Sequence, residues 1–175
     1  MHRILKAEAF VLKKKQLLNK DALIVLFTRE SGKITAIAKG IRKITSRRIG
    51  SLMTGNLISV SLAQSKETHY LQQVRIISLF SRIKKSPVAL RQAYFFLYLT
   101  DKLLPEMQSD VGVFNRIKKI MIMLSAEPFS RETEWAMCKD FLKLCGYPVP
   151  DESATAIIQR IEEIIGRKIP PILYN

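Results

Sequence analysis

The sequence predicts an α+β protein built as two consecutive blocks, five short strands followed by about four helices. The apolar pattern changes at Ser86-Pro87, from short or alternating runs before this step to helical spacing after it. The charge changes at the same place, because residues 1–85 hold 18 basic and 4 acidic side chains, a net charge of +14, whereas residues 86–175 hold 11 of each. We therefore expect two domains with different roles, at residues 1–82 and 87–175.

The first block contains five segments whose apolar residues alternate or run together, as they do in half-buried or fully buried strands. The segments are Ile4–Leu12, Leu23–Thr28, Lys33–Lys39, Leu57–Leu62 and Thr68–Ile76. The second and third are joined at hairpin length by Glu30-Ser31-Gly32, in which the glycine can adopt a positive φ. The second segment is apolar on both faces, so we expect the helical domain to pack against this block.

The second block has helical periodicity with recognisable ends. The helices expected at Val88–Leu104 and Val111–Ser125 each stop at or before a proline. Ser130 and Ser153 can cap two further helices, and each of these is followed by a glycine that can end it. This block is expected to be an all-helical domain.

Five strands in roughly 80 residues close most economically as an OB-fold barrel, a scaffold that often binds nucleic acid. In the third strand Ile34, Ala36 and Ala38 point one way. Lys33, Thr35 and Lys39 then point the other way, onto the face where an OB-fold binds its ligand.

Two runs of basic residues that contain no acidic residue are candidate nucleic-acid sites. Residues 39–48 carry five positive charges, and the lysines of residues 13–20 occupy the expected loop between the first two strands. Tyr70 is in phase with Val74 and Ile76 and is expected in the core, so phosphate contacts and a steep salt dependence should dominate binding. The candidate contacts are Lys13, Lys14, Lys15, Arg29, Lys33, Lys39, Arg42, Lys43, Arg47 and Arg48.

Signals for catalysis or a bound metal are weak. The glycine spacing of residues 50–55 is that of a phosphate loop, but Asn56-Leu57 follows where Lys and Ser or Thr are required. Cys138 and Cys145 lie about 10.5 Å apart along one expected helix, too far for a disulfide. With two histidines in the chain and no Cys-x-x-Cys pair, a zinc site is not expected either. We expect a binding protein without a cofactor rather than an enzyme.

The neutral second block suggests a surface for proteins. Arg116, Lys118 and Lys119 lie beside apolar residues and could receive an acidic, apolar-tipped peptide, although a solvated helix face with core residues behind it is the favoured explanation. The longest apolar run, residues 93–99, is too short to cross a membrane, and Lys6 and Glu8 interrupt any signal-peptide core. We expect a cytoplasmic monomer.

Several motifs then suggest a family. The sequence reads A-E-A-F-V-L at 7–12, L-F-T-R-E-S-G-K-I at 26–34, A-K-G-I-R-K at 38–43 and Ser46-Arg47 soon after. Weaker matches follow at 104–106, 144–148 and 165–168. In this order the motifs resemble the RecO family of bacterial DNA repair and recombination mediator proteins.

The resemblance implies an amino-terminal OB-fold, a helical carboxyl-terminal domain and no known catalytic activity. It implies binding of single- and double-stranded DNA, annealing of complementary strands and help in loading RecA. The implied protein partners are RecR and the acidic tail of single-stranded-DNA-binding protein. Lys39, Arg42, Lys43 and Arg47 would belong to the family's DNA-contacting surface.

One departure and two alternatives remain. Many family members carry a zinc-binding, cysteine-bearing insertion after the Leu-Gly-Tyr segment, whereas here residues 147–151 lead almost directly into the last helix, so a short, zinc-free form is expected. The basic barrel could instead be an RNA-binding OB-fold module associated with translation or RNA metabolism. A divergent metal-dependent nuclease or nucleotidyl-transferring enzyme is the alternative from another class.

Overall fold

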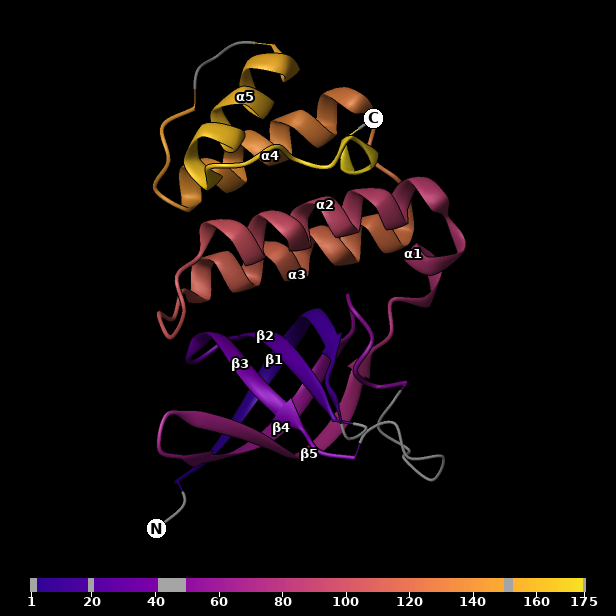
Figure 1. The fold of residues 1–175 in the computed structure, drawn as a ribbon. Helices are drawn as coiled ribbons and strands as arrows, with labels where there is room; N and C mark the ends of the chain where they lie inside the picture. The colour runs from indigo at the N-terminus through magenta and orange to yellow at the C-terminus, as the bar shows by residue number, and fades with distance from the viewer. Residues whose placement is uncertain (1–2, 19–20, 41–49, 150–152, 175) are drawn as a thin grey trace. The chain divides into compact units, whose positions relative to one another are not determined.

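In the computed structural model the chain divides into two compact units, one a barrel and the other a set of helices (Figure 1). The first unit comprises Met1–Phe80 with Pro105–Val111, and the second comprises Ser81–Leu104 with Gly112–Asn175. The residues described are 3–18, 21–40, 50–149 and 153–174. Between two helices of the second unit the chain therefore contributes a short segment to the first.

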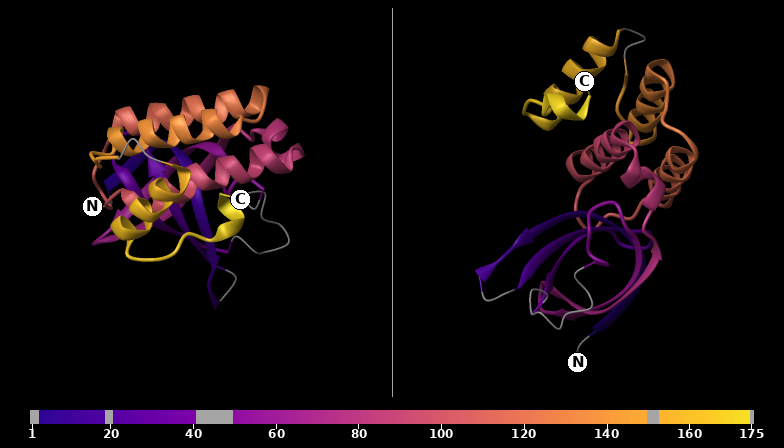
Figure 2. Two further views of the ribbon diagram at one scale, coloured as in Figure 1. Left: turned by 90° about the horizontal axis from the view of Figure 1, so that it is seen from above. Right: turned by 90° about the vertical axis from the view of Figure 1, so that its right-hand side faces the viewer.

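The first unit is a closed barrel in the order β1-β2-β3-β5-β4, and its ring of strands is visible in the right-hand view of Figure 2. All neighbouring strands are antiparallel except β3 and β5, whose short parallel pairing closes the barrel. The strands are β1 (Arg3–Gln16), β2 (Ala22–Thr28), β3 (Gly32–Ala38), β4 (Leu57–Ser65) and β5 (Thr68–Ser78). The predicted α+β fold with an amino-terminal five-stranded barrel is confirmed.

Alternate residues of the five strands fill the barrel and form its apolar core. Many of these inward side chains are small, as a narrow barrel requires, and Leu52 from the connection before β4 adds to them. The core consists of Ala7, Ala9, Val11, Ala22, Ile24, Leu26, Ile34, Ala36, Ala38, Leu52, Ile58, Val60, Leu62 and Leu71.

Strand β1 extends beyond its predicted end at Leu12 and includes three lysines. A bulge between Val11 and Lys13 lets the strand continue, so that Lys13, Lys14 and Lys15 pair with β2. The prediction that these lysines form a loop is wrong. Three consecutive lysines do not show the apolar alternation by which a strand is predicted, although the solvent-facing side of an antiparallel sheet accommodates lysine readily.

Residues Pro105–Val111 lie against β3 within the first unit. Lys33 and Glu106 form an isolated parallel bridge, and the Met107 amide donates to the Lys33 carbonyl at 2.9 Å. The Thr35 hydroxyl donates to Glu106 Oε1 at 3.1 Å. This segment, which we call the β3 strap, therefore covers part of the outer face of β3.

The second unit contains five helices and one 3₁₀ turn within its described residues. Ser86, Ser130 and Ser153 cap α2, α4 and α5, because each side chain accepts a hydrogen bond from the amide three residues later. The five-residue α1 was not predicted, since it is too short to show periodicity. The elements are α1 (Ser81–Lys85), α2 (Pro87–Leu103), α3 (Val111–Ala126), α4 (Arg131–Leu144), α5 (Ala154–Ile165) and η2 (Pro171–Leu173).

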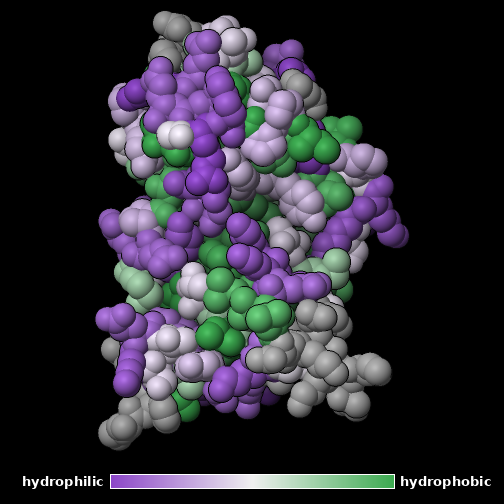
Figure 3. Space-filling model, in the orientation of Figure 1, coloured by the Kyte–Doolittle hydropathy of each residue, from purple (hydrophilic) through white to green (hydrophobic). Residues whose placement is uncertain are grey.

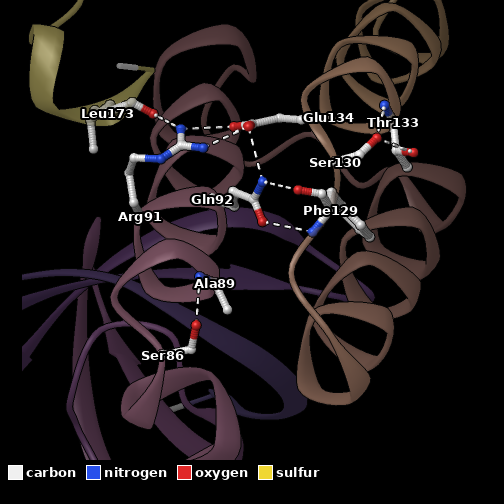
Figure 4. Close-up of polar contacts among 9 residues, drawn as sticks. All are labelled: Ser86, Ala89, Arg91, Gln92, Phe129, Ser130, Thr133, Glu134 and Leu173. Carbon is white, nitrogen blue, oxygen red and sulfur yellow. Dashed lines mark hydrogen bonds and ion pairs between the residues drawn. The ribbon is translucent and has the colours of Figure 1, made fainter.

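A buried polar network joins α2, α4 and the carboxyl-terminal turn (Figure 4). Arg91 binds Glu134 at two points, with N to O distances of 2.8 and 2.6 Å, and also donates to the Leu173 carbonyl at 2.8 Å. Gln92 donates to Glu134 Oε2 and exchanges hydrogen bonds with the Phe129 backbone. The network supplies hydrogen bonds to the carboxylate of Glu134, a residue that is 2% exposed.

None of the described helices is long and apolar enough to span a membrane.

Candidate nucleic-acid interface

An uninterrupted line of apolar side chains crosses four strands on the outside of the barrel. Ile37 pairs with Leu23 on β2 and with Tyr70 on β5, and Tyr70 pairs with Ala63 on β4. Paired residues share a face, and the flanking residues on these strands belong to the core, so all four point outwards. We call Leu23, Ile37, Ala63 and Tyr70 the outer apolar row; each is half-buried.

Lysines stand beside this row. Lys15 pairs with Leu23 and Lys13 with Val25, so both point outwards from β1, and both are exposed. Lys14 instead lies opposite Ile24 and faces the inner side, where it is half-buried. The structure therefore separates the three consecutive lysines, and Lys13 and Lys15 are the two that are exposed on the outer face. Figure 3 shows hydrophilic and apolar side chains together over the barrel.

Lys39 completes the basic border. It is exposed just after β3, and its Nζ lies 4.8 Å from the centre of the Tyr70 ring, a cation–π distance. Among the described residues no acidic side chain forms an ion pair with Lys39. Its charge therefore remains available to an anionic ligand. We refer to Lys13, Lys15 and Lys39 as the flanking lysines.

Tyr70 is not a core residue, and the prediction that placed it there is wrong. In β5 the register shifts beside Leu62, so that Leu71 faces the interior and the phase of Tyr70 is reversed relative to Val74. Ile76, at the other end of the predicted alternation, is 48% exposed. The barrel consequently presents an aromatic ring that the strand pattern had assigned to the core.

Other predicted contacts lie apart from the apolar row. Arg29 is exposed at the β2–β3 turn, whereas Lys33 is half-buried and its backbone is bonded to the β3 strap. Thr35 points away from the core, and its hydroxyl donates to Glu106 of the β3 strap. The β3 strap therefore bounds the exposed face at Thr35. The predicted contacts Arg42, Lys43, Arg47 and Arg48 lie outside the described residues.

The region with phosphate-loop spacing is a structural turn. The buried Asn56 side chain donates to the carbonyls of Gly50 and Ser51, at 3.0 and 2.9 Å. These bonds use the amide to hold the turn that carries Leu52 into the core. Within the ranges that the structure describes, no three His, Cys, Asp or Glu residues are grouped to hold a metal ion.

The helical unit contains a pocket that the sequence did not signal. It measures about 500 Å³, and α4, α5 and the segment after α5 line it, including Arg131, Trp135, Ile158, Lys168 and Tyr174. Lys168 donates to Glu162 at 2.7 Å, which lowers the pKa of Glu162 and raises the pKa of Lys168, so that both stay charged at neutral pH. These residues are distant in sequence, and only folding brings them together.

The predicted protein-binding cluster on α3 does not line that pocket. Arg116 lies 3.6 Å from Asp140 of α4 in an ion pair. Lys118 is half-buried and Lys119 is exposed. The pocket combines apolar groups, Arg131 and the Lys168–Glu162 ion pair in one concave site.

The sequence of the barrel matches a known protein family. Residues 1–80 match the family model described as "Recombination protein O N terminal". A DNA repair protein RecO of Alkaliphilus metalliredigens is 25% identical over 130 residues, which are 74% of this chain and 53% of the relative. That of Clostridium novyi is 28% identical over 91% of this chain and 63% of its own length. That of Pelotomaculum thermopropionicum is 26% identical over 99% and 64%. The chain spans about half the length of the first of these relatives.

Proposed function

We propose that this chain is a recombination mediator of the RecO family, which binds single- and double-stranded DNA, anneals complementary strands and assists RecA loading. One observation carries the proposal. The family's domain coincides with the barrel, and there exposed lysines border an open outer face. The proposed role is non-catalytic.

Annealing would follow from charge neutralisation. Two complementary strands repel each other through their phosphates, and lysines that bind both backbones reduce that repulsion. Phosphate contacts fix the position of a strand without occupying its base edges, so pairing can proceed while the protein is bound. Lys13 and Lys15 on β1 and Lys39 after β3 supply such contacts at separate points of one face.

The test is annealing of complementary oligonucleotides with and without the protein, across a salt series and with single-stranded-DNA-binding protein present or absent. We expect the protein to accelerate annealing, and the acceleration to fall as salt rises. Equal rates with and without the protein at low salt would contradict the proposal.

Two further experiments distinguish the proposed function from RNA binding and from catalysis. Matched DNA and RNA strands should compete about equally if phosphates dominate, whereas a clear preference for RNA would favour an RNA-binding module. Labelled DNA incubated with Mg²⁺ and nucleotides should remain intact. Turnover that survives repurification would favour a nuclease or a nucleotidyl-transferring enzyme.

We further propose RecR and the acidic tail of single-stranded-DNA-binding protein as protein partners. The pocket beside Trp135 supports the second, because Arg131 suits acidic residues and Ile158 suits an apolar tip. Trp135 is the only tryptophan in the chain, so its fluorescence reports on this pocket.

An acidic peptide with an apolar carboxyl end should change the Trp135 fluorescence saturably. Arg131→Glu should weaken this binding, while Lys119→Glu on α3 serves as the control. If only Lys119→Glu weakens it, the site is on α3. Co-migration with purified RecR on a sizing column tests the other partner.

A further inference from the structure

We infer that the outer apolar row contacts the unpaired bases of a single strand, with Tyr70 as the stacking residue, and that Lys39 leaves the Tyr70 ring when a strand binds. The inference rests on the proposed DNA-binding function and deepens it. It names the form of DNA that this face selects and the residue that makes the selection.

Three residues of the outer apolar row form a continuous apolar surface across neighbouring strands. Leu23, Ile37 and Tyr70 are consecutive partners across three neighbouring strands, and all three are half-buried. Neighbouring strands lie about 4.8 Å apart, so the three residues span about 10 Å, which is wider than a single base. Apolar surface of this kind on a basic barrel suits a ligand that has both flat apolar groups and negative charge.

Lys39 lies over the Tyr70 ring, with its Nζ 4.8 Å from the ring centre. A lysine over a ring that is still partly in contact with water gains only a small free energy from the cation–π contact, so a base can replace it at small cost. Within the described residues Lys39 has no acidic partner that would hold it in place. In a nucleotide the base and its phosphate are covalently joined, so one nucleotide can stack on Tyr70 and bind the displaced Lys39.

A second lysine–tyrosine pair in the chain provides the contrast. On α2, Lys102 Nζ lies 5.7 Å from the centre of the Tyr98 ring, but it also donates to Asp101 Oδ2 at 2.7 Å. That cation is already paired with a carboxylate, and Tyr98 lies on a helix rather than among the strands of the barrel. Tyr98 is therefore a matched control for Tyr70.

Selectivity for single strands follows from the state of the bases. In a duplex the bases are stacked and paired inside the helix and cannot reach a ring on the protein surface. Tyr70 should thus contribute to the binding of single strands and leave duplex binding unchanged, whereas the flanking lysines should contribute to both.

The experiment compares two strands of about 16 nucleotides with equal numbers of phosphates, one carrying thymine and one abasic throughout. We expect the wild-type chain to bind the thymine strand about tenfold more tightly than the abasic strand. Tyr70→Leu should bind the two strands equally, with an unchanged salt slope. Tyr70→Phe and Tyr98→Leu should both keep the wild-type ratio.

Lys39→Met tests the second half of the inference. It should lower the salt slope for the thymine strand by about 0.7, the value of one single-strand phosphate contact, and keep a preference for thymine over abasic strand. Circular dichroism establishes that each variant is folded.

The outcomes separate this inference from the proposed function. If the wild-type protein binds both strands equally, or if folded Tyr70→Leu keeps the thymine preference, base stacking at Tyr70 is wrong while DNA binding stands. The stacking inference is also overturned if Tyr70→Leu weakens duplex binding equally. If the wild-type protein binds neither strand nor duplex, the proposed function itself fails.

Discussion

Gly32 lies directly against the backbone of Gln108: a Cβ atom at residue 32 would stand 1.9 Å from the Gln108 carbonyl oxygen. Gly32 also has a φ of 70°, a conformation that costs other residues about 1–2 kcal/mol. The β3 strap can approach β3 because residue 32 has no side chain.

Gly32→Ala should therefore destabilise the barrel by more than the 1–2 kcal/mol of backbone strain, because the β3 strap must also move. Urea unfolding followed by circular dichroism measures the loss. Gly50→Ala is the control, since a Cβ there would meet nothing within 4 Å. Equal stability of the two variants would show that the strap contact is dispensable.

The pair of Arg91 and Glu134 should dominate the stability of the helical unit. Glu134→Ala leaves the Arg91 guanidinium without its carboxylate in a site where it is 17% exposed, and we expect a loss of roughly 3 kcal/mol. Arg160→Ala removes an exposed pair with Glu163 and should cost under about 1 kcal/mol. Urea unfolding followed by Trp135 fluorescence distinguishes the two. Similar losses in both variants would contradict a dominant role for the buried pair.

The two cysteines should react at different rates with an alkylating reagent. Burial raises the pKa of the Cys138 thiol, so at pH 8 little of it is the reactive thiolate, and the side chain is also inaccessible. Cys145 is half-buried. Mass spectrometry after brief alkylation should find one label on the native protein, at Cys145, and two labels in urea. Prompt native labelling of Cys138 would mean that α4 opens readily.

The basic segment at residues 39–48 gives a prediction that stands on the sequence alone. Reversing the charge of Arg42, Lys43, Arg47 and Arg48 should abolish annealing, because four phosphate contacts become repulsive. The fold should survive, which circular dichroism can establish. A folded variant that anneals at the wild-type rate would exclude this segment from the site.

Local pattern was sufficient to predict several elements. The serine caps at Ser130 and Ser153 and the five strands depend on residues near one another in sequence, and the structure contains them close to where they were expected. Such features can be predicted because their main interactions lie within a few residues.

The features that shape the candidate site depend on distant partners. The register shift beside Leu62, which turns Tyr70 outwards, arises only when β4 and β5 pair. Glu106 meets Thr35 across 71 residues of chain, and no local signal marks that contact. The lysines of β1 were assigned to a loop because their charge obscured a strand that β2 completes.

The salt dependence of single-strand binding tests the central claim, that the lysine-bearing outer face of the barrel holds DNA phosphates. The measurement is the slope of log Kobs against log salt concentration for a thymine strand. Lys13→Gln with Lys15→Gln should reduce its magnitude by about 1.4, because two phosphate contacts are lost. Lys119→Gln with Lys143→Gln, two exposed lysines of the helical unit, should leave it unchanged. An unchanged slope in the folded Lys13 and Lys15 variant would contradict the account.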